Sequence, residues 1–137
     1  MISIYSESFK PNYGKHNKMK IVLIHDNIPI QMGVRQNISP EHEVVVFGAV
    51  DGNLLGELVK KTKETLVVIQ WGLLKEGTGN FVMSLKRHEE FRVWVISGNF
   101  TGDEDHIVQE MLRAGADKAM CSFDLLRHLK EAGLTKS

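Results

Sequence analysis

The sequence predicts an α/β protein in which helices cover both faces of a doubly wound, five-stranded parallel sheet. Short runs of apolar, mostly β-branched residues recur along the chain, and they lack the polar alternation of a half-exposed strand. Such runs are typical of parallel strands that are buried on both faces. Segments with a helical repeat separate the runs, and right-handed crossovers between parallel strands then place helices on both sides of the sheet.

Five apolar runs mark the expected strands. Four of them are rich in valine, isoleucine and leucine, namely residues 21–24, 44–47, 66–69 and 93–96. The fifth run, residues 118–121, is weaker because it contains Lys118 and Ala119. Strand and helix therefore alternate five times along the chain.

Apolar residues at helical spacing mark the expected helices. The first helix covers residues 28–38 and has Pro29 in its first turn, where proline is tolerated. Gly115 ends the fourth helix, and acidic residues in its first turn favour the helix dipole. The remaining expected helices centre on residues 54–59, 81–85, 107–112 and 125–129.

Composition excludes several classes of protein. The 137 residues fit one domain, and 17 basic residues balance 17 acidic ones. Zero net charge argues against bulk binding of nucleic acid, so we expect no direct nucleic-acid contact. A single cysteine, Cys121, excludes a disulfide scaffold and a cysteine-rich zinc module. A membrane-spanning helix needs about 20 consecutive apolar residues, and no stretch of the sequence comes close to that length, so we expect no contact with a membrane.

The first 18 residues differ from the rest of the chain. They are rich in serine, asparagine and lysine, and they lack the apolar core of a secretory signal. We expect residues 1–18 to be a flexible extension and residues 19–134 to form the domain. The lone cysteine and the absence of an export signal favour a cytoplasmic location. With no basic neighbour in sequence, Cys121 is expected to be a buried, inert thiol.

Polar residues gather where the expected strands end. In a doubly wound sheet, this carboxyl edge is where ligands bind. Asp26 is the one carboxylate at the edge, which is too little for a Mg²⁺ site, so we expect neither metal nor cofactor. The edge segments are His25-Asp26-Asn27, Gln70-Trp71-Gly72, Ser97-Gly98-Asn99 and Cys121-Ser122-Phe123.

Residues 20–132 resemble the receiver domain of two-component response regulators, as in the bacterial chemotaxis regulator. The resemblance implies a flavodoxin-like (βα)5 sandwich. The most specific match is EMLRAGADKAMCSF at residues 110–123, with its Gly-Ala-Asp signature. The other matches are KIVLIHDNIPIQMGVRQNI (20–38), TLVVIQWGLLKEGTG (65–79) and RVWVISG (92–98).

The resemblance fails at the residues that carry phosphotransfer. The family's phosphoacceptor aspartate falls on Gln70, whose amide cannot form an acyl phosphate. The family's lysine falls on Ser122, and Lys118 lies too far back along its strand to replace it. The acidic pair falls on His25 and Asp26, and the hydroxyl position on Ser97. The resemblance therefore implies a pseudo-receiver that is not an enzyme.

Two functions follow from this interpretation. The first is a regulatory module in two-component-type signal transduction that acts by protein–protein contact without phosphorylation. The alternative is a module that binds a small ligand or an anion in the vacated pocket. Gln70 either locks one state by hydrogen bonds to Ser97 and Asp26 or simply caps its strand.

Trp71 and Lys75 are candidates for contact with a ligand or partner. Trp71 either stands at the mouth of the site or folds over the edge of the core. Lys75 follows Gln70 in the next loop, where it is the better-placed substitute for the family's lysine.

The fourth and fifth helices are candidates for a protein interface. The resemblance implies that this face binds a protein partner or a second copy of the chain, and opposite charges suit a two-fold homodimer. Two ordinary solvated faces remain the alternative. The residues concerned are Asp103, Glu104, Asp105 and Glu110 on the fourth helix, and Arg127, His128 and Lys130 on the fifth.

Overall fold

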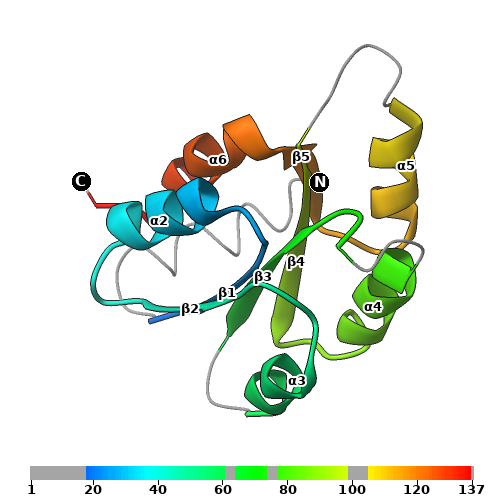
Figure 1. The fold of residues 1–137 in the computed structure, drawn as a ribbon, viewed down its shortest axis with the longest axis horizontal. Coiled ribbons are helices and arrows are strands. Elements are labelled where there is room, and N and C mark those ends of the chain that lie inside the picture. The colour runs from blue at the N-terminus through cyan, green and yellow to red at the C-terminus, as the bar shows by residue number, and fades with distance from the viewer. Residues whose placement is uncertain (1–17, 61–63, 74–76, 99–104, 137) are drawn as a thin grey trace.

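A single parallel sheet with the order β2-β1-β3-β4-β5 forms the centre of the protein (Figure 1). The computed structural model describes residues 18–60, 64–73, 77–98 and 105–136. All the expected strands are confirmed; the first four are one to three residues longer than expected, and the fifth has the expected bounds. Their bounds are β1 Lys20–Ile24, β2 Glu43–Phe47, β3 Thr65–Gln70, β4 Phe91–Ser97 and β5 Lys118–Cys121.

Helices cover both faces of the sheet, which confirms the doubly wound prediction. In Figure 1, α2 and α6 lie together on one face, while α3, α4 and α5 lie on the other. A short 3-10 helix, η2 (Ser122–Asp124), leads from β5 into α6. The helices are α2 Ile28–Asn37, α3 Gly52–Leu58, α4 Thr78–Leu85, α5 Asp105–Arg113 and α6 Leu125–Glu131.

Two hydrophobic cores explain why the central strands show no alternation. Ile21 and Leu23 of β1 face the core under α2 and α6. Val22 and Ile24 face the core under α3, α4 and α5. Because both faces are covered, every position of the strand is buried and selected for apolar residues. Strand β2 departs from this pattern, since it lies at the sheet edge and is only half-buried.

The Gly-Ala-Asp segment joins α5, β4 and β5. Gly115 has a φ of +109°, a left-handed conformation that suits glycine at a helix end. An Asp117 carboxylate oxygen accepts hydrogen bonds from the Val93 backbone N–H at 2.8 Å and from Lys86 Nζ at 2.9 Å. The Asp117 side chain thus ties the start of β5 to β4 and to the residue that follows α4.

The last described residues fold back onto the end of α2. Leu134 is fully buried, and Thr135 forms an antiparallel bridge with Ile38. The Lys136 N–H donates to the Asn37 carbonyl at 2.9 Å. The expected extension, apart from Lys18, lies outside the described residues. In the described part of the chain, no helix has the length and apolar character needed to cross a membrane.

Candidate functional site

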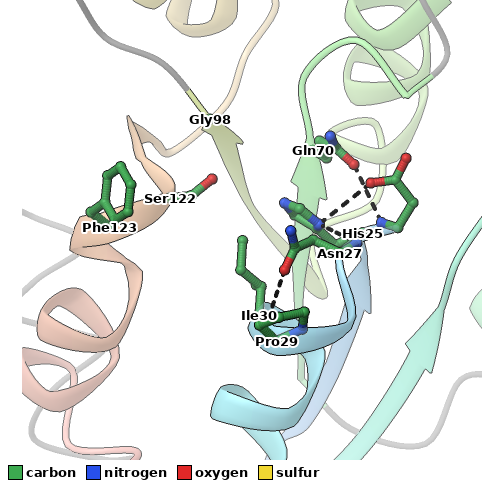
Figure 2. A pocket seen from close by; sticks show the side chains of 9 residues that line it. His25, Asn27, Pro29, Ile30, Gln70, Gly98, Ser122 and Phe123 are labelled. Carbon is green, nitrogen blue, oxygen red and sulfur yellow. Dashed lines mark hydrogen bonds and ion pairs between the residues drawn. The ribbon is translucent and has the colours of Figure 1, made fainter.

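A pocket of about 430 Å³ opens at the carboxyl edge of the sheet (Figure 2). Strand register brings the ends of β1, β3 and β4 together there, because Ile24 pairs with Ile69 and Gln70 pairs with Ile96. Of the five residues at the predicted degenerate phosphorylation site, Ser97 is not part of the lining, although its neighbour Gly98 is. The lining residues are His25, Asp26, Asn27, Pro29, Ile30, Gln70, Gly98, Ser122 and Phe123.

Local hydrogen bonds fix the loop between β1 and α2. Asn27 caps α2, since its side-chain oxygen accepts from the Ile30 N–H at 3.0 Å. The Asn27 N–H in turn donates to His25 Nδ1 at 3.0 Å. The Gln31 side-chain amide donates to the His25 carbonyl. The His25 ring is therefore held in one orientation at the pocket wall.

The tautomer of His25 follows from this geometry. Because Nδ1 accepts a backbone N–H, it cannot also carry the proton of a neutral imidazole, so the proton lies on Nε2. Burial lowers the pKa of His25 below 6.5, although the Asp26 carboxylate acts in the opposite direction. The residue is only 3% exposed. Its Nε2 atom is buried and has no hydrogen-bond partner among the residues that the structure describes.

Gln70 is joined to the neighbouring strand through its side-chain oxygen. This oxygen accepts a hydrogen bond from the Asp26 backbone N–H at 3.3 Å. The contact between Gln70 and Asp26 is thus made to the backbone and not to the carboxylate. The Asp26 side chain itself is 61% exposed and lies 3.9 Å from His25 Nδ1.

Ser122 and Phe123 form the wall opposite His25 (Figure 2). The Ser122 Oγ atom is buried and, like His25 Nε2, has no hydrogen-bond partner in the described part of the chain. The Phe123 side chain lies at the rim and is 87% exposed. Lys118 does not supply a cation here, because its Nζ atom lies 5.1 Å from the centre of the Trp94 ring, under α6.

Trp71 lies away from this pocket. Its side chain is half-buried and packs against the core under α3, α4 and α5. It also borders a separate hollow with Met83 of α4 and Arg113 of α5. The interpretation that placed Trp71 at the mouth of the site is therefore wrong, and the alternative at the core edge is correct. Lys75 lies outside the described residues.

The expected basic face of α6 needs a correction at His128. Its side chain is only 21% exposed, and its ring packs edge-on against Trp94. The pKa of His128 is lowered mainly by burial and to a smaller extent by the positive charge of Lys118. Arg127 and Lys130 are exposed as expected, but Arg127 already pairs with Asp124 of η2 and with Glu131 on its own helix.

The other expected positions are only partly described. On α5, Glu110 is exposed as expected, whereas Asp103 and Glu104 lie outside the described residues. Cys121 is half-buried and not fully buried, because β5 is an edge strand. Within the described ranges, no three His, Cys, Asp or Glu residues are grouped closely enough to hold a metal ion.

Comparisons with known proteins identify the fold. No protein-family model and no curated protein sequence matches the chain. Among solved structures, an orphan response regulator of H. pylori matches with a TM-score of 0.59 and 18% identity, covering 88% of this chain and 98% of that one. This chain has the receiver fold.

Two further structures agree with this assignment. A CheY-like receiver domain from Methanospirillum hungatei matches with a TM-score of 0.62 and 20% identity, covering 84% of this chain and 93% of that one. A response regulator from Thermotoga maritima matches with a TM-score of 0.61 and 13% identity, covering 85% of this chain and 98% of that one. In the receiver fold, the pocket described above lies at the strand ends where the resemblance places the family's phosphorylation site.

Two residues of the pocket, Pro29 and Ile30, lie outside the strand-end segments expected at this edge. Asn27 and Phe123 belong to those segments, and an asparagine followed by Ile28-Pro29 is also a typical helix start. The place of Ile30 at the pocket had no signal in the sequence, because it depends on how α2 and η2 approach each other.

Proposed function

We propose that this chain is a regulatory module of two-component-type signal transduction that acts by contact with a protein partner and without phosphorylation. The observation that carries the proposal is Gln70 at the end of β3. An uncharged amide stands where a receiver needs a carboxylate nucleophile. In this interpretation the module is a pseudo-receiver and not an enzyme, and it acts in the cytoplasm.

The surroundings of Gln70 support the same proposal. Its side-chain oxygen is already engaged by the Asp26 N–H. His25 replaces one acid of the family's pair, and its lowered pKa keeps it uncharged at neutral pH. Mg²⁺ requires carboxylate or phosphate oxygens, and Asp26 alone supplies too few. The likeness to an orphan response regulator is compatible with this assignment.

The surface formed by α5, β5 and α6 is the candidate interface. Glu110 of α5 and Lys130 of α6 are exposed and carry opposite charges. Val108 and Leu112 lie four residues apart on α5, and Leu112 is exposed, so apolar contact can assist the charges. A protein partner or a second copy of the chain would bind there.

Exposure to phosphoryl donors tests the proposal. The protein is incubated with Mg²⁺ and either acetyl phosphate or beryllofluoride, and its intact mass and its amide NMR spectrum are recorded. We expect no adduct and no change in the spectrum, whereas a receiver that has the aspartate serves as the positive control. A Mg²⁺-dependent phosphoryl adduct on this chain would overturn the proposal.

A further inference from the structure

Two buried polar atoms that have no hydrogen-bond partner among the described residues face one pocket from opposite sides. His25 Nε2 lies at the end of β1, and Ser122 Oγ lies at the start of η2. Figure 2 shows the free edge of the His25 ring and the Ser122 hydroxyl pointing toward each other across the pocket. Buried polar groups are almost always paired, so two such atoms at one site require an explanation.

Both atoms are able to donate a hydrogen bond. The bond from the Asn27 N–H to His25 Nδ1 leaves the ring proton on Nε2. The Ser122 hydroxyl rotates and can donate or accept. A single oxygen atom with two lone pairs, such as a carbonyl oxygen, would satisfy both donors at once.

The charge of the pocket selects against an anion. Among the described residues that line it, none is a lysine or an arginine, and Asp26 supplies a carboxylate. His25 is uncharged at neutral pH because burial lowers its pKa. An anionic ligand would meet the Asp26 charge, and no described residue of the lining supplies a compensating cation. The anion alternative considered from sequence is therefore the weaker one.

The rest of the pocket is suited to an apolar body. Pro29 and Ile30 of α2 form one wall, and the Phe123 ring stands at the rim. A volume of about 430 Å³ lies within the range of small-molecule sites. Because the Phe123 side chain is 87% exposed, it can turn to admit a ligand without disturbing the core.

We propose that this pocket binds an uncharged small molecule whose carbonyl oxygen lies between His25 Nε2 and Ser122 Oγ and whose apolar body packs against Pro29, Ile30 and Phe123. This inference goes beyond the proposed protein–protein function and does not depend on it. The ligand site depends only on the two donors, whether or not the surface of α5, β5 and α6 binds a partner.

Three uncharged carbonyl probes test the proposal: benzamide, acetophenone and δ-valerolactone. Each is titrated into the ¹⁵N-labelled protein, and the imidazole nitrogens of His25 and the backbone amides of Ile30 and Phe123 are followed by NMR. We expect the spectrum of the free protein to show the Nε2–H tautomer. At least one probe should give saturable shifts, with a dissociation constant of about 1 mM, as suits a fragment.

Benzoate is the matched charged probe, because it has the shape of benzamide. We expect it to bind at least about tenfold more weakly, since it brings a second negative charge to Asp26. Equal binding of benzoate and benzamide would overturn the choice of an uncharged ligand.

Ser122→Ala removes one of the two donors and should weaken probe binding about 5- to 10-fold. Thr78→Val is the matched control, because Thr78 Oγ1 is also buried without a partner but lies on α4, outside the pocket. We expect Thr78→Val to bind the probes as the parent protein does. Equal losses in both variants would overturn the role of Ser122.

The absence of saturable shifts with all three probes up to about 20 mM would overturn the proposal. The two donors would then be satisfied by a buried water molecule and not by a ligand.

Discussion

The side-chain oxygen of Gln70 and the backbone N–H of Asp26 form a hydrogen bond of 3.3 Å that links the ends of β3 and β1. The pairing places an uncharged contact at the centre of the carboxyl edge. In a receiver that undergoes phosphorylation, the same region must gather several negative charges around a cation. Here an amide oxygen and a backbone N–H join the strand ends.

Restoring the carboxylate alone should not restore phosphorylation. In Gln70→Asp the shorter side chain loses the bond to the Asp26 N–H and brings a second negative charge close to Asp26. Position 122 still lacks a lysine, and His25 still replaces an acid. We expect no phosphoryl adduct after treatment with acetyl phosphate and Mg²⁺, measured by intact mass.

The triple variant His25→Asp, Gln70→Asp, Ser122→Lys is the comparison, and it should gain Mg²⁺-dependent binding of beryllofluoride. Efficient labelling of the single variant would contradict this account.

Reversing charges on α6 should weaken self-association. Exposed ion pairs contribute only about 0–1 kcal/mol each, so any dimer should be weak and lost at high salt. Arg127→Glu with Lys130→Glu should shift the sedimentation profile toward monomer at low salt without unfolding the protein. Arg35→Glu, an exposed change on α2, serves as the control and should have no effect. If the parent protein is monomeric at high concentration and low salt, homodimerisation through this face is wrong, and only a different partner remains.

Asp117 should matter more to stability than the lysine that it pairs with. Asp117→Ala leaves the Val93 N–H without its side-chain acceptor, which should lower the free energy of unfolding by about 1–3 kcal/mol. Lys86→Met removes the ion pair but keeps that bond, so it should cost less. Urea unfolding measures both variants. A larger loss for Lys86→Met would mean that the contacts of Lys86 Nζ with Asp117 and with the Phe91 carbonyl contribute more than the bond from the Val93 N–H.

Acidification should destabilise the protein through its buried histidines. The pKa values of His25 and His128 are both lowered from 6.5 in the folded state, so the unfolded chain binds protons more readily. Their contribution to stability is complete above pH 6.5 and falls as the pH drops toward the folded-state values. Urea unfolding at a series of pH values should show this slope, and His128→Gln should reduce it in part. Rising stability on acidification just below pH 6.5 would rule this account out.

The fold could be predicted from sequence because strands that are buried on both faces of the sheet consist of continuous runs of apolar residues. Val22 and Leu23 are adjacent residues that face different cores, and both must be apolar. Outside these runs, no pattern in the sequence shows in which direction a side chain points. The sequence leaves Trp71 either at the mouth of the site or over the edge of the core, and it predicts His128 on the exposed face of its helix. In the structure both rings pack against the interior.

The candidate site was only partly predictable for a related reason. Strand order brings His25, Gln70 and Ser122 to one edge, and an expected topology is enough to foresee that. The free donor on His25 depends on a hydrogen bond from a loop N–H two residues away. No spacing of residue types in the sequence indicates that bond.

The segment from His25 to Gln31, which includes the first turn of α2, is connected by its own hydrogen bonds. Three hydrogen bonds connect its residues. The Asn27 N–H donates to the His25 imidazole, the Ile30 N–H donates to the Asn27 side chain, and the Gln31 side-chain amide donates to the His25 carbonyl. The conformational entropy of this wall is therefore lost during folding and not during binding. A fixed donor also favours molecules whose acceptor lies at the right angle and distance over flexible ones of similar polarity. In the ligand site proposed above, Asn27, which contributes to two of the three bonds, would therefore set the shape selectivity through the orientation that it gives to the ring.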